Sequence, residues 1–156
     1  MYRKFFVSRW LSAVLFMAFA AGLSLPASAQ GRGVTVASHE SYQQTVSQLK
    51  SAVAGGGMMV MATVDQGKML SMTGLKLNAT LFIVGNPTVG KMIFSQDPAV
   101  GLYVPFRVYV YEKNGTTYVS YDKPSTLLKP FGNSHIDMTA AMLDKKFQGL
   151  VAMATK

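Results

Sequence analysis

One segment of the sequence contains most of the residues of a phosphate-binding loop. Residues 85–91 (GNPTVGK) follow an apolar run and match the glycine-rich loop and lysine of nucleotide-binding proteins, except at the position after the lysine. That position needs a Ser or Thr hydroxyl for magnesium, and Met92 stands there. We expect residues 92–94 to be extended rather than to start a phosphate-binding helix, because Asp97 and Pro98 follow so soon. The segment therefore favours a turn between strands over a nucleotide site.

Two short segments match the Ser-x-x-Lys motif of penicillin-recognising enzymes, which act outside the cytoplasm. They run from Ser47 to Lys50 and from Ser120 to Lys123. Ser47 is predicted in the middle of a helix and Ser120 on a strand, and the companion Ser-Asp-Asn and Lys-Thr-Gly motifs are missing from the sequence. We interpret both serines as solvent-facing residues.

Histidine and methionine offer a second route to chemistry. His39 and His135, the two histidines of the chain, each precede a predicted helix, and neither has the partner four residues away that metal ligation from one helix requires. Methionines gather at residues 58–61 and 69–72, and thioethers bind Cu(I). Residues 58–61 lie in an apolar run, where methionine usually fills the core. A periplasmic copper- or metal-handling protein or small enzyme using His39, His135 and the methionines is kept as the alternative hypothesis.

The clearest local pattern is a β-hairpin with two different faces. Residues 106–112 and 117–121 flank Asn114 and Gly115, a pair that tolerates the two positive φ values of a type I′ turn. The resulting register places one set of side chains in the core: Val108, Val110, Val119 and Tyr121. The other face carries Arg107, Tyr109, Tyr111, Tyr118, Ser120 and Asp122. This tyrosine face could stack on a flat ligand, a sugar or a second subunit, or it could be covered by a helix.

The remaining elements predict one α+β domain. A strand at residues 34–37 precedes a helix at 42–53, which a Ser41 and Gln44 capping box begins. Residues 58–64 predict a buried central strand, because they are apolar on both parities. The other expected elements are a short helix capped by Asp65 and ending at Met72, a buried strand at 80–84, and an amphipathic helix at about 136–150.

The first 29 residues predict a secretory signal peptide. A basic start is followed by an apolar stretch at residues 10–23 and by Ala27, Ser28 and Ala29, small residues suited to signal peptidase. The apolar stretch is shorter than the roughly 20 residues of a membrane-spanning helix. We therefore expect residues 30–156 to form a single exported domain, periplasmic or secreted, with no transmembrane segment after cleavage.

Composition removes several classes of function. The chain has 156 residues with 15 Lys or Arg, 7 Asp or Glu and no Cys. Without cysteine there is no disulfide framework, thiolate nucleophile, Cys-bound metal or lipidated N-terminal cysteine. The net charge of +8 falls when the basic signal is removed, and the lysines are scattered, so we expect no nucleic-acid partner.

A larger set of residues resembles the Domain of Unknown Function 302 family. The resemblance covers about residues 42–128 and rests on Asp65, Gly74, residues 81–87 (LFIVGNP), Gly90, Pro98, residues 104–107 (VPFR), Glu112, Gly115, Ser120, Tyr121 and Pro124. It implies a small two-layer α+β domain in which helices pack on one face of an antiparallel-rich sheet, similar in outline to TATA-binding-protein-like folds. It also makes a homodimer plausible and implies no activity, because none is established for the family.

Three departures from the family pattern shape the functional prediction. The family usually has His where Gln66 stands, Thr where Lys91 stands and Asp where Tyr103 stands. This loss of polar residues favours a non-catalytic module that binds a small apolar or aromatic ligand or a protein partner, without a cofactor or metal. The residues predicted to bind it are Asp65, Asn86, Arg107, Tyr109, Tyr111 and Tyr121, with Arg107 orienting the ligand and the tyrosines stacking on it.

Overall fold

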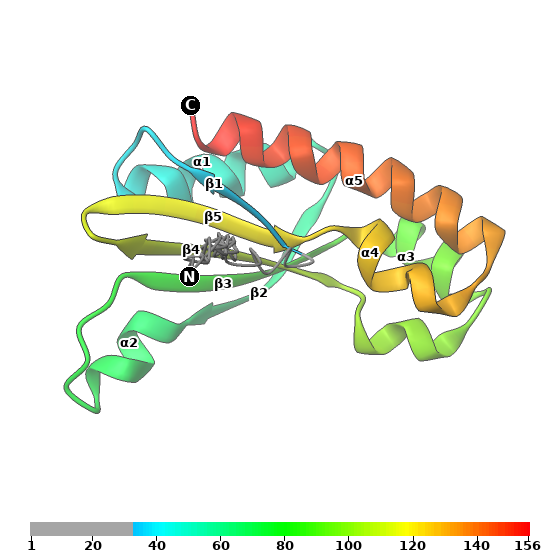
Figure 1. Cartoon of the computed structure of the whole chain (residues 1–156), viewed down its shortest axis with the longest axis horizontal. Helices are drawn as coiled ribbons and strands as arrows, with labels where there is room; N and C mark the ends of the chain where they lie inside the picture. Colours follow the sequence, from blue (N-terminus) through cyan, green and yellow to red (C-terminus); the bar gives the residue numbers. More distant parts are fainter. Residues whose placement is uncertain (1–32) are drawn as a thin grey trace, which may run out of the picture.

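The computed structural model describes residues 33–156, which form a five-stranded sheet packed against helices (Figure 1). The predicted signal peptide, residues 1–29, lies outside the described residues. The strands are β1 (Gly33–Ala37), β2 (Met59–Asp65), β3 (Ala79–Gly85), β4 (Phe106–Lys113) and β5 (Thr116–Asp122). They are ordered β1-β5-β4-β3-β2, and every neighbouring pair is antiparallel. The predicted α+β class, with an antiparallel sheet, is confirmed.

Helices fill each connection of the sheet except the β4–β5 hairpin. They are α1 (Tyr42–Gly55), α2 (Gln66–Ser71), α3 (Pro87–Phe94), the 3₁₀ turn η1 (Pro98–Leu102), α4 (Pro124–Leu128), the 3₁₀ turn η2 (Lys129–Phe131) and α5 (Ser134–Ala154). The predicted capping box begins α1, where Ser41 and Gln44 exchange hydrogen bonds between side chain and backbone. Figure 1 shows α3 and α4 gathered at one end of the sheet, with α2 at the opposite end.

The hydrophobic core lies on one face of the sheet, beneath α1 and α5. We call this the covered face; its strand residues are Phe82, Val84, Phe106, Val108, Val110, Val119 and Tyr121. Helix α5 runs the length of the domain and contributes Leu143, Phe147 and Leu150 to the core (Figure 1). Helix α1 adds Leu49 and Val53. The two long helices therefore pack on one face, as predicted.

The predicted hairpin is confirmed in its turn and in its register. Asn114 has φ 54° and Gly115 has φ 77°, the two positive values that the type I′ turn needs. Tyr111 pairs with Tyr118, and Val108 pairs with Tyr121. Alternation along β4 and β5 therefore separates the core residues from the tyrosines as expected.

Strand β2 is not the central strand that its apolar run predicts. It is the edge strand of the sheet, with β3 as its only neighbour among residues 33–156. Met59 is 54% exposed and Met61 is 45% exposed, and a register shift between Val60 and Ala62 marks a bulge. The prediction was wrong because an apolar run shows only that a strand can be buried. It does not show which strands have a neighbour on both sides.

The expected turn at residues 85–94 is also wrong, because residues 87–94 form α3. Asn86 caps this helix and Pro87 occupies its first turn, where a missing N–H costs nothing. The rejection of a nucleotide site does not depend on the helix, since Met92 still replaces the magnesium-binding hydroxyl. Within residues 33–156, no helix has the length and apolar character needed to cross a membrane.

Candidate functional site

The sheet face opposite the core carries large side chains that neither α1 nor α5 covers. We call it the open face, and its central residues are Leu81, Ile83, Arg107, Tyr109, Tyr111, Tyr118 and Ser120. Arg107 is exposed, and the others are partly exposed. The hypothesis that a helix covers the tyrosines is therefore wrong for the two long helices, which pack on the other side.

Three tyrosines of the open face form a row of stacked rings. The ring centroids of Tyr109 and Tyr111 are 5.0 Å apart with an interplanar angle of 18°. Those of Tyr111 and Tyr118 are 5.4 Å apart at 22°. A flat ligand between two rings would need about 7 Å, twice the van der Waals contact distance, so none fits inside the row. A ligand can stack only at the ends of the row, of which Tyr109 is one.

A depression of about 380 Å³ lies at the Tyr109 end of the row. Its walls include Leu81 and Tyr109 as apolar surface, with Arg107, Gln66 and Ser120 as polar groups. Gly33, Tyr121 and Asp122 complete the lining. The depression therefore combines an aromatic wall with hydrogen-bond donors and acceptors, which is the usual composition of a small-molecule site.

The electrostatics of the depression leave Arg107 available to a ligand. Among residues 33–156, the one ion pair joins Lys129 to Asp137, at 3.3 Å, far along the chain from Arg107. Burial raises the pKa of the Tyr109 hydroxyl, and the hydroxyls of Tyr111 and Tyr42 add to that rise. Tyr109 is therefore neutral at pH 7 and can donate a hydrogen bond while its ring stacks.

Two of the predicted site residues lie away from the open face and cap helices. The Asp65 carboxylate accepts a hydrogen bond from the Lys68 amide at 2.8 Å and begins α2, as its position in the sequence predicts. Asn86 accepts from the amides of Thr88 and Val89, and its side-chain NH₂ donates to the Gly57 carbonyl oxygen at 2.7 Å. Asn86 therefore ties the start of α3 to the turn before β2.

Asp65 also borders a separate hollow of about 520 Å³ near the start of α1. Tyr42 shares this hollow, and its hydroxyl lies 2.6 Å from the Thr80 hydroxyl. Burial raises the pKa of Tyr42, the Thr80 hydrogen bond lowers it in part, and the Asp65 charge raises it. Lys68 and Lys76 line the same hollow together with Val46, Leu77 and Ala79, so it mixes charged and apolar surface, and Tyr42 supplies its aromatic surface.

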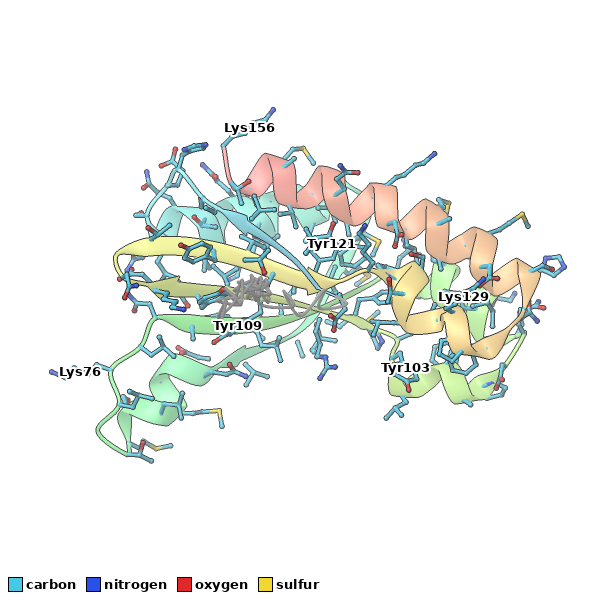
Figure 2. The ribbon with its side chains drawn as sticks, viewed as in Figure 1. Lys76, Tyr103, Tyr109, Tyr121, Lys129 and Lys156 are labelled. Carbon is cyan, nitrogen blue, oxygen red and sulfur yellow. The ribbon has the colours of Figure 1, made fainter. Side chains whose placement is uncertain are left out.

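Tyr121 borders the depression, yet its ring belongs to the covered face. It is 6% exposed and stacks on Phe147 of α5 with centroids 5.6 Å apart; Figure 2 labels it on the side nearer α5. Burial raises the pKa of its hydroxyl, with a further contribution from Asp144. The structure thus brings together Arg107, Tyr109 and Tyr111 of the predicted set, and it assigns the Tyr121 ring to the core.

Sequence reasoning missed Leu81 and Ile83 as open-face residues and Gln66 as a lining residue of the depression. Leu81 and Ile83 lie on β3 in a run that is apolar on both parities, so no alternation marks which members face away from the core. Register supplies the missing information, because Leu81 pairs with Tyr109 and Ile83 with Arg107. The alternation of tyrosines on β4 would therefore identify Leu81 and Ile83 as open-face residues, but only once the pairing of β3 with β4 is known.

The two histidines are too far apart to share a metal ion. The His39 amide donates to the Thr155 carbonyl just beyond the end of α5, whereas His135 lies in the first turn of α5. About 20 helical residues separate these points, or about 30 Å. Within residues 33–156, no group of three or more His, Asp or Glu side chains is placed to hold a metal ion.

One solved structure shares this fold, and curated relatives match part of the sequence. Over 96 residues the chain is 31% identical to the fluoride-specific ion channel FluC 1 of Brucella suis biovar 1 and to FluC 2 of Brucella melitensis biotype 1. The match covers 60% of this chain but spans only 38% and 36% of those channels. A crystal structure of an uncharacterised conserved DUF302 protein from Bacillus stearothermophilus superposes with a TM-score of 0.75 at 21% identity. It covers 81% of this chain and 99% of that one.

The comparison with family models settles membership. Residues 34–154 match one model, which spans all five strands and the long helices α1 and α5. The residues that carry the resemblance seen in the sequence, from Asp65 to Pro124, all lie inside this range. The chain therefore belongs to the family described as Domain of unknown function DUF302.

Proposed function

We propose that this protein is an exported, non-catalytic binding module that holds a small flat ligand in the depression at the Tyr109 end of the open face. The observation that carries the proposal is the position of the depression at the free end of a stacked tyrosine row, beside Arg107. An aromatic side chain that is only half covered retains a large surface on which a ring can stack.

The lining residues suggest the chemistry of the ligand. The ring of Tyr109 would stack on a flat ring, and Arg107 would donate hydrogen bonds to an acceptor such as a carboxylate. Ser120 and Gln66 offer further polar contacts. Asp122 adds a negative charge to the rim, which favours a ligand that carries a donor as well as an acceptor. These features support a polar aromatic ligand over an aliphatic one.

Two further observations support an exported accessory module. The basic, apolar and small-residue pattern of residues 1–29 is that of a secretory signal. The Brucella relatives are named as fluoride channels, and the stretch shared with this chain is little more than a third of their length. A domain that recurs as part of a longer chain suits a binding role beside another protein, and a second copy of this chain is an alternative occupant of the open face.

The first experiment is native mass spectrometry of the protein purified gently from the export compartment of a bacterial host. The expected result is a chain that begins at Gln30 with an additional non-covalent mass. Tyr109→Ala should remove that mass, whereas Tyr118→Ala, at the far end of the row, should leave it in place.

A titration followed by amide chemical shifts tests the ligand chemistry directly. Indole-3-carboxylate should shift amides on β4 and β5 next to the depression, and neutral indole-3-carboxamide should bind more weakly. In Arg107→Gln the difference between the two compounds should disappear. Shifts confined to the hollow at Asp65 and Tyr42, or a bare dimer without bound mass, would contradict this proposal.

A further inference from the structure

Helix α5 carries a set of soft metal ligands on its solvent side, and the tyrosine site does not use them. Met138 is 67% exposed, Met142 is 46% exposed, and His135 is exposed in the first turn of the helix. Figure 2 shows sulfur atoms, drawn yellow, on the outer side of α5. We propose that His135, Met138 and Met142 together bind one Cu(I) ion. This inference is independent of the proposed ligand in the depression.

Helical spacing places the three side chains on one stripe. Positions three, four and seven residues apart lie on the same side of a helix, and those are the separations within this set. The inward side of α5 is occupied instead by Ile136, Leu143 and Phe147, all buried. The three donors therefore share a stripe that the core does not need.

The direction of helical side chains brings the donor atoms closer than the backbone positions imply. The Cα–Cβ bonds of a helix tilt toward its N-terminus, so the Met142 thioether extends over the turn that holds Met138. Met138 in turn extends toward His135. Neighbouring Cβ atoms at these spacings are about 5–6 Å apart, which two flexible thioethers and an imidazole can bridge through a common ion.

The donor types select the metal. Thioether sulfurs are soft ligands that prefer Cu(I) to hard cations, and imidazole nitrogen is a good copper ligand as well. A set with two thioethers and no carboxylate is poorly suited to Mg²⁺ or Ca²⁺, which take oxygen ligands. The chain has no cysteine that would compete for the ion.

Other exposed methionines of the described chain lack this combination. Met69 and Met72 lie on and just after α2, which carries no histidine. Met59 and Met61 flank a bulge on β2, where His is also missing. Met92 lies on α3, which likewise carries no histidine. Met153 lies on α5 but eleven residues beyond Met142, or about 16 Å along the axis. His135, Met138 and Met142 are therefore the strongest set.

The local charges do not favour a cation, because Lys145 and Lys146 follow Met142 by three and four residues on the same side of α5. The Lys146 ammonium donates to the Gly56 carbonyl oxygen at 2.6 Å, which leaves Lys145 as the nearer free charge on that side. The N-terminus of α5 is the positive end of its dipole, but Asp137 lies in that same turn and pairs with Lys129. Binding must therefore come from the donor atoms themselves and not from the surrounding field. This predicts a strong dependence on each thioether.

The test is a competition titration of the purified protein, produced from the full sequence, against bicinchoninate under anaerobic conditions with Cu(I). We expect one ion per chain. Met138→Leu and Met142→Leu keep size and helix propensity but remove the sulfur, and each should weaken binding by at least about tenfold. His135→Gln should weaken it to a similar degree. Met153→Leu is the matched control on the same helix and should change affinity by less than about twofold.

A second readout places the ion. Ag(I), an air-stable analogue of Cu(I), should shift the ε-methyl NMR signals of Met138 and Met142 and leave those of Met69 and Met153 unchanged. Far-UV circular dichroism of each variant should match the parent chain, because all three side chains lie outside the core. The proposal is overturned by an absence of Cu(I) binding, by unchanged affinity in the double variant M138L/M142L, or by methyl shifts at other methionines alone.

Discussion

The two faces of the sheet are built from the same strands but differ in burial. Along β4, Phe106, Val108 and Val110 point to the covered face and are buried, while Arg107 and Tyr109 point to the open face and are not. Strict alternation of the strand separates the two sets. The helices that connect the strands, above all α1 and α5, then pack on one side only.

The open face differs in composition from an ordinary solvated sheet face. An antiparallel sheet commonly presents one solvated face, and that face is normally polar. Here it carries three stacked tyrosines together with Leu81 and Ile83. Such a surface gains free energy by being covered, whereas the valine and phenylalanine face is already covered by helices. The comparison places the stabilising contacts on one face, and it supports the proposed binding role of the other.

The largest effect should come from removing a side chain beneath α5. Phe147 is 1% exposed and contacts the rings of Phe106 and Tyr121 at centroid distances of 5.5 and 5.6 Å. Phe147→Ala loses this buried ring and leaves a cavity, so we expect a loss of about 3–5 kcal/mol in the free energy of unfolding. Urea denaturation followed by circular dichroism measures it. A loss below about 1 kcal/mol would show that Phe147 of α5 is not packed in the core.

A smaller loss of stability should follow from removing the cap of α3. Asn86→Ala deletes two accepted hydrogen bonds and the donated bond to Gly57, and should cost about 1–2 kcal/mol. Asn86→Ser should restore part of the loss, because serine is also a good cap. If Asn86→Ala instead abolished ligand retention without a change in stability, Asn86 would belong to the binding surface after all.

The sequence predicts the hairpin and its two faces because the information is local. Asn114 and Gly115 define the turn, and the turn sets the register that separates Val108 from Tyr109. Helix starts at Ser41 and Asp65 are predicted for the same reason, since a cap acts within three residues. Membership of a family adds the overall layout.

The errors arise where the outcome depends on distant pairing. Strand β2 looks central in sequence, but its place at the edge follows from the order in which the strands pair. Residues 92–94 form the last turn of α3, because Asn86 and Pro87 favour a helix start over the turn expected there. The site is predicted only in part, since Tyr109 and Arg107 need β3 beside them to form the depression.

Truncation within the tyrosine row should cost little stability. Tyr111→Ala removes two ring stacks on the partly exposed face, and aromatic pairs contribute about 0.5–1.5 kcal/mol each beyond their burial. We expect a total loss of about 1 kcal/mol, because much of the ring already contacts solvent. The same urea denaturation applies. A loss equal to that of Phe147→Ala would show that the open face is a second core, and it would break the comparison.

High pH should weaken both faces through their tyrosines. Burial raises the pKa of Tyr109 on the open face and of Tyr121 on the covered face above the usual 10.0. The unfolded chain then ionises first, so the stability from these groups is complete below about pH 10 and is lost as pH rises toward the folded pKa values. Thermal unfolding followed between about pH 8 and pH 11 should show this decline. In Tyr109→Phe the decline should be shallower, and an unchanged profile would contradict the assignment.

The smallest effect on stability and the sharpest on binding should come from Arg107. Its side chain is exposed and takes part in no ion pair among residues 33–156, so Arg107→Gln should change the free energy of unfolding by less than about 0.5 kcal/mol. The same substitution removes the charged donor that the depression offers to a carboxylate. Binding of indole-3-carboxylate should therefore weaken by about tenfold or more, since hydrogen bonds to a charged group contribute about 1.5–3 kcal/mol. A variant with full stability and lost binding separates the two faces by function. A variant with lost stability would instead place Arg107 in the structural framework, and the binding role would then have to rest on Tyr109 alone.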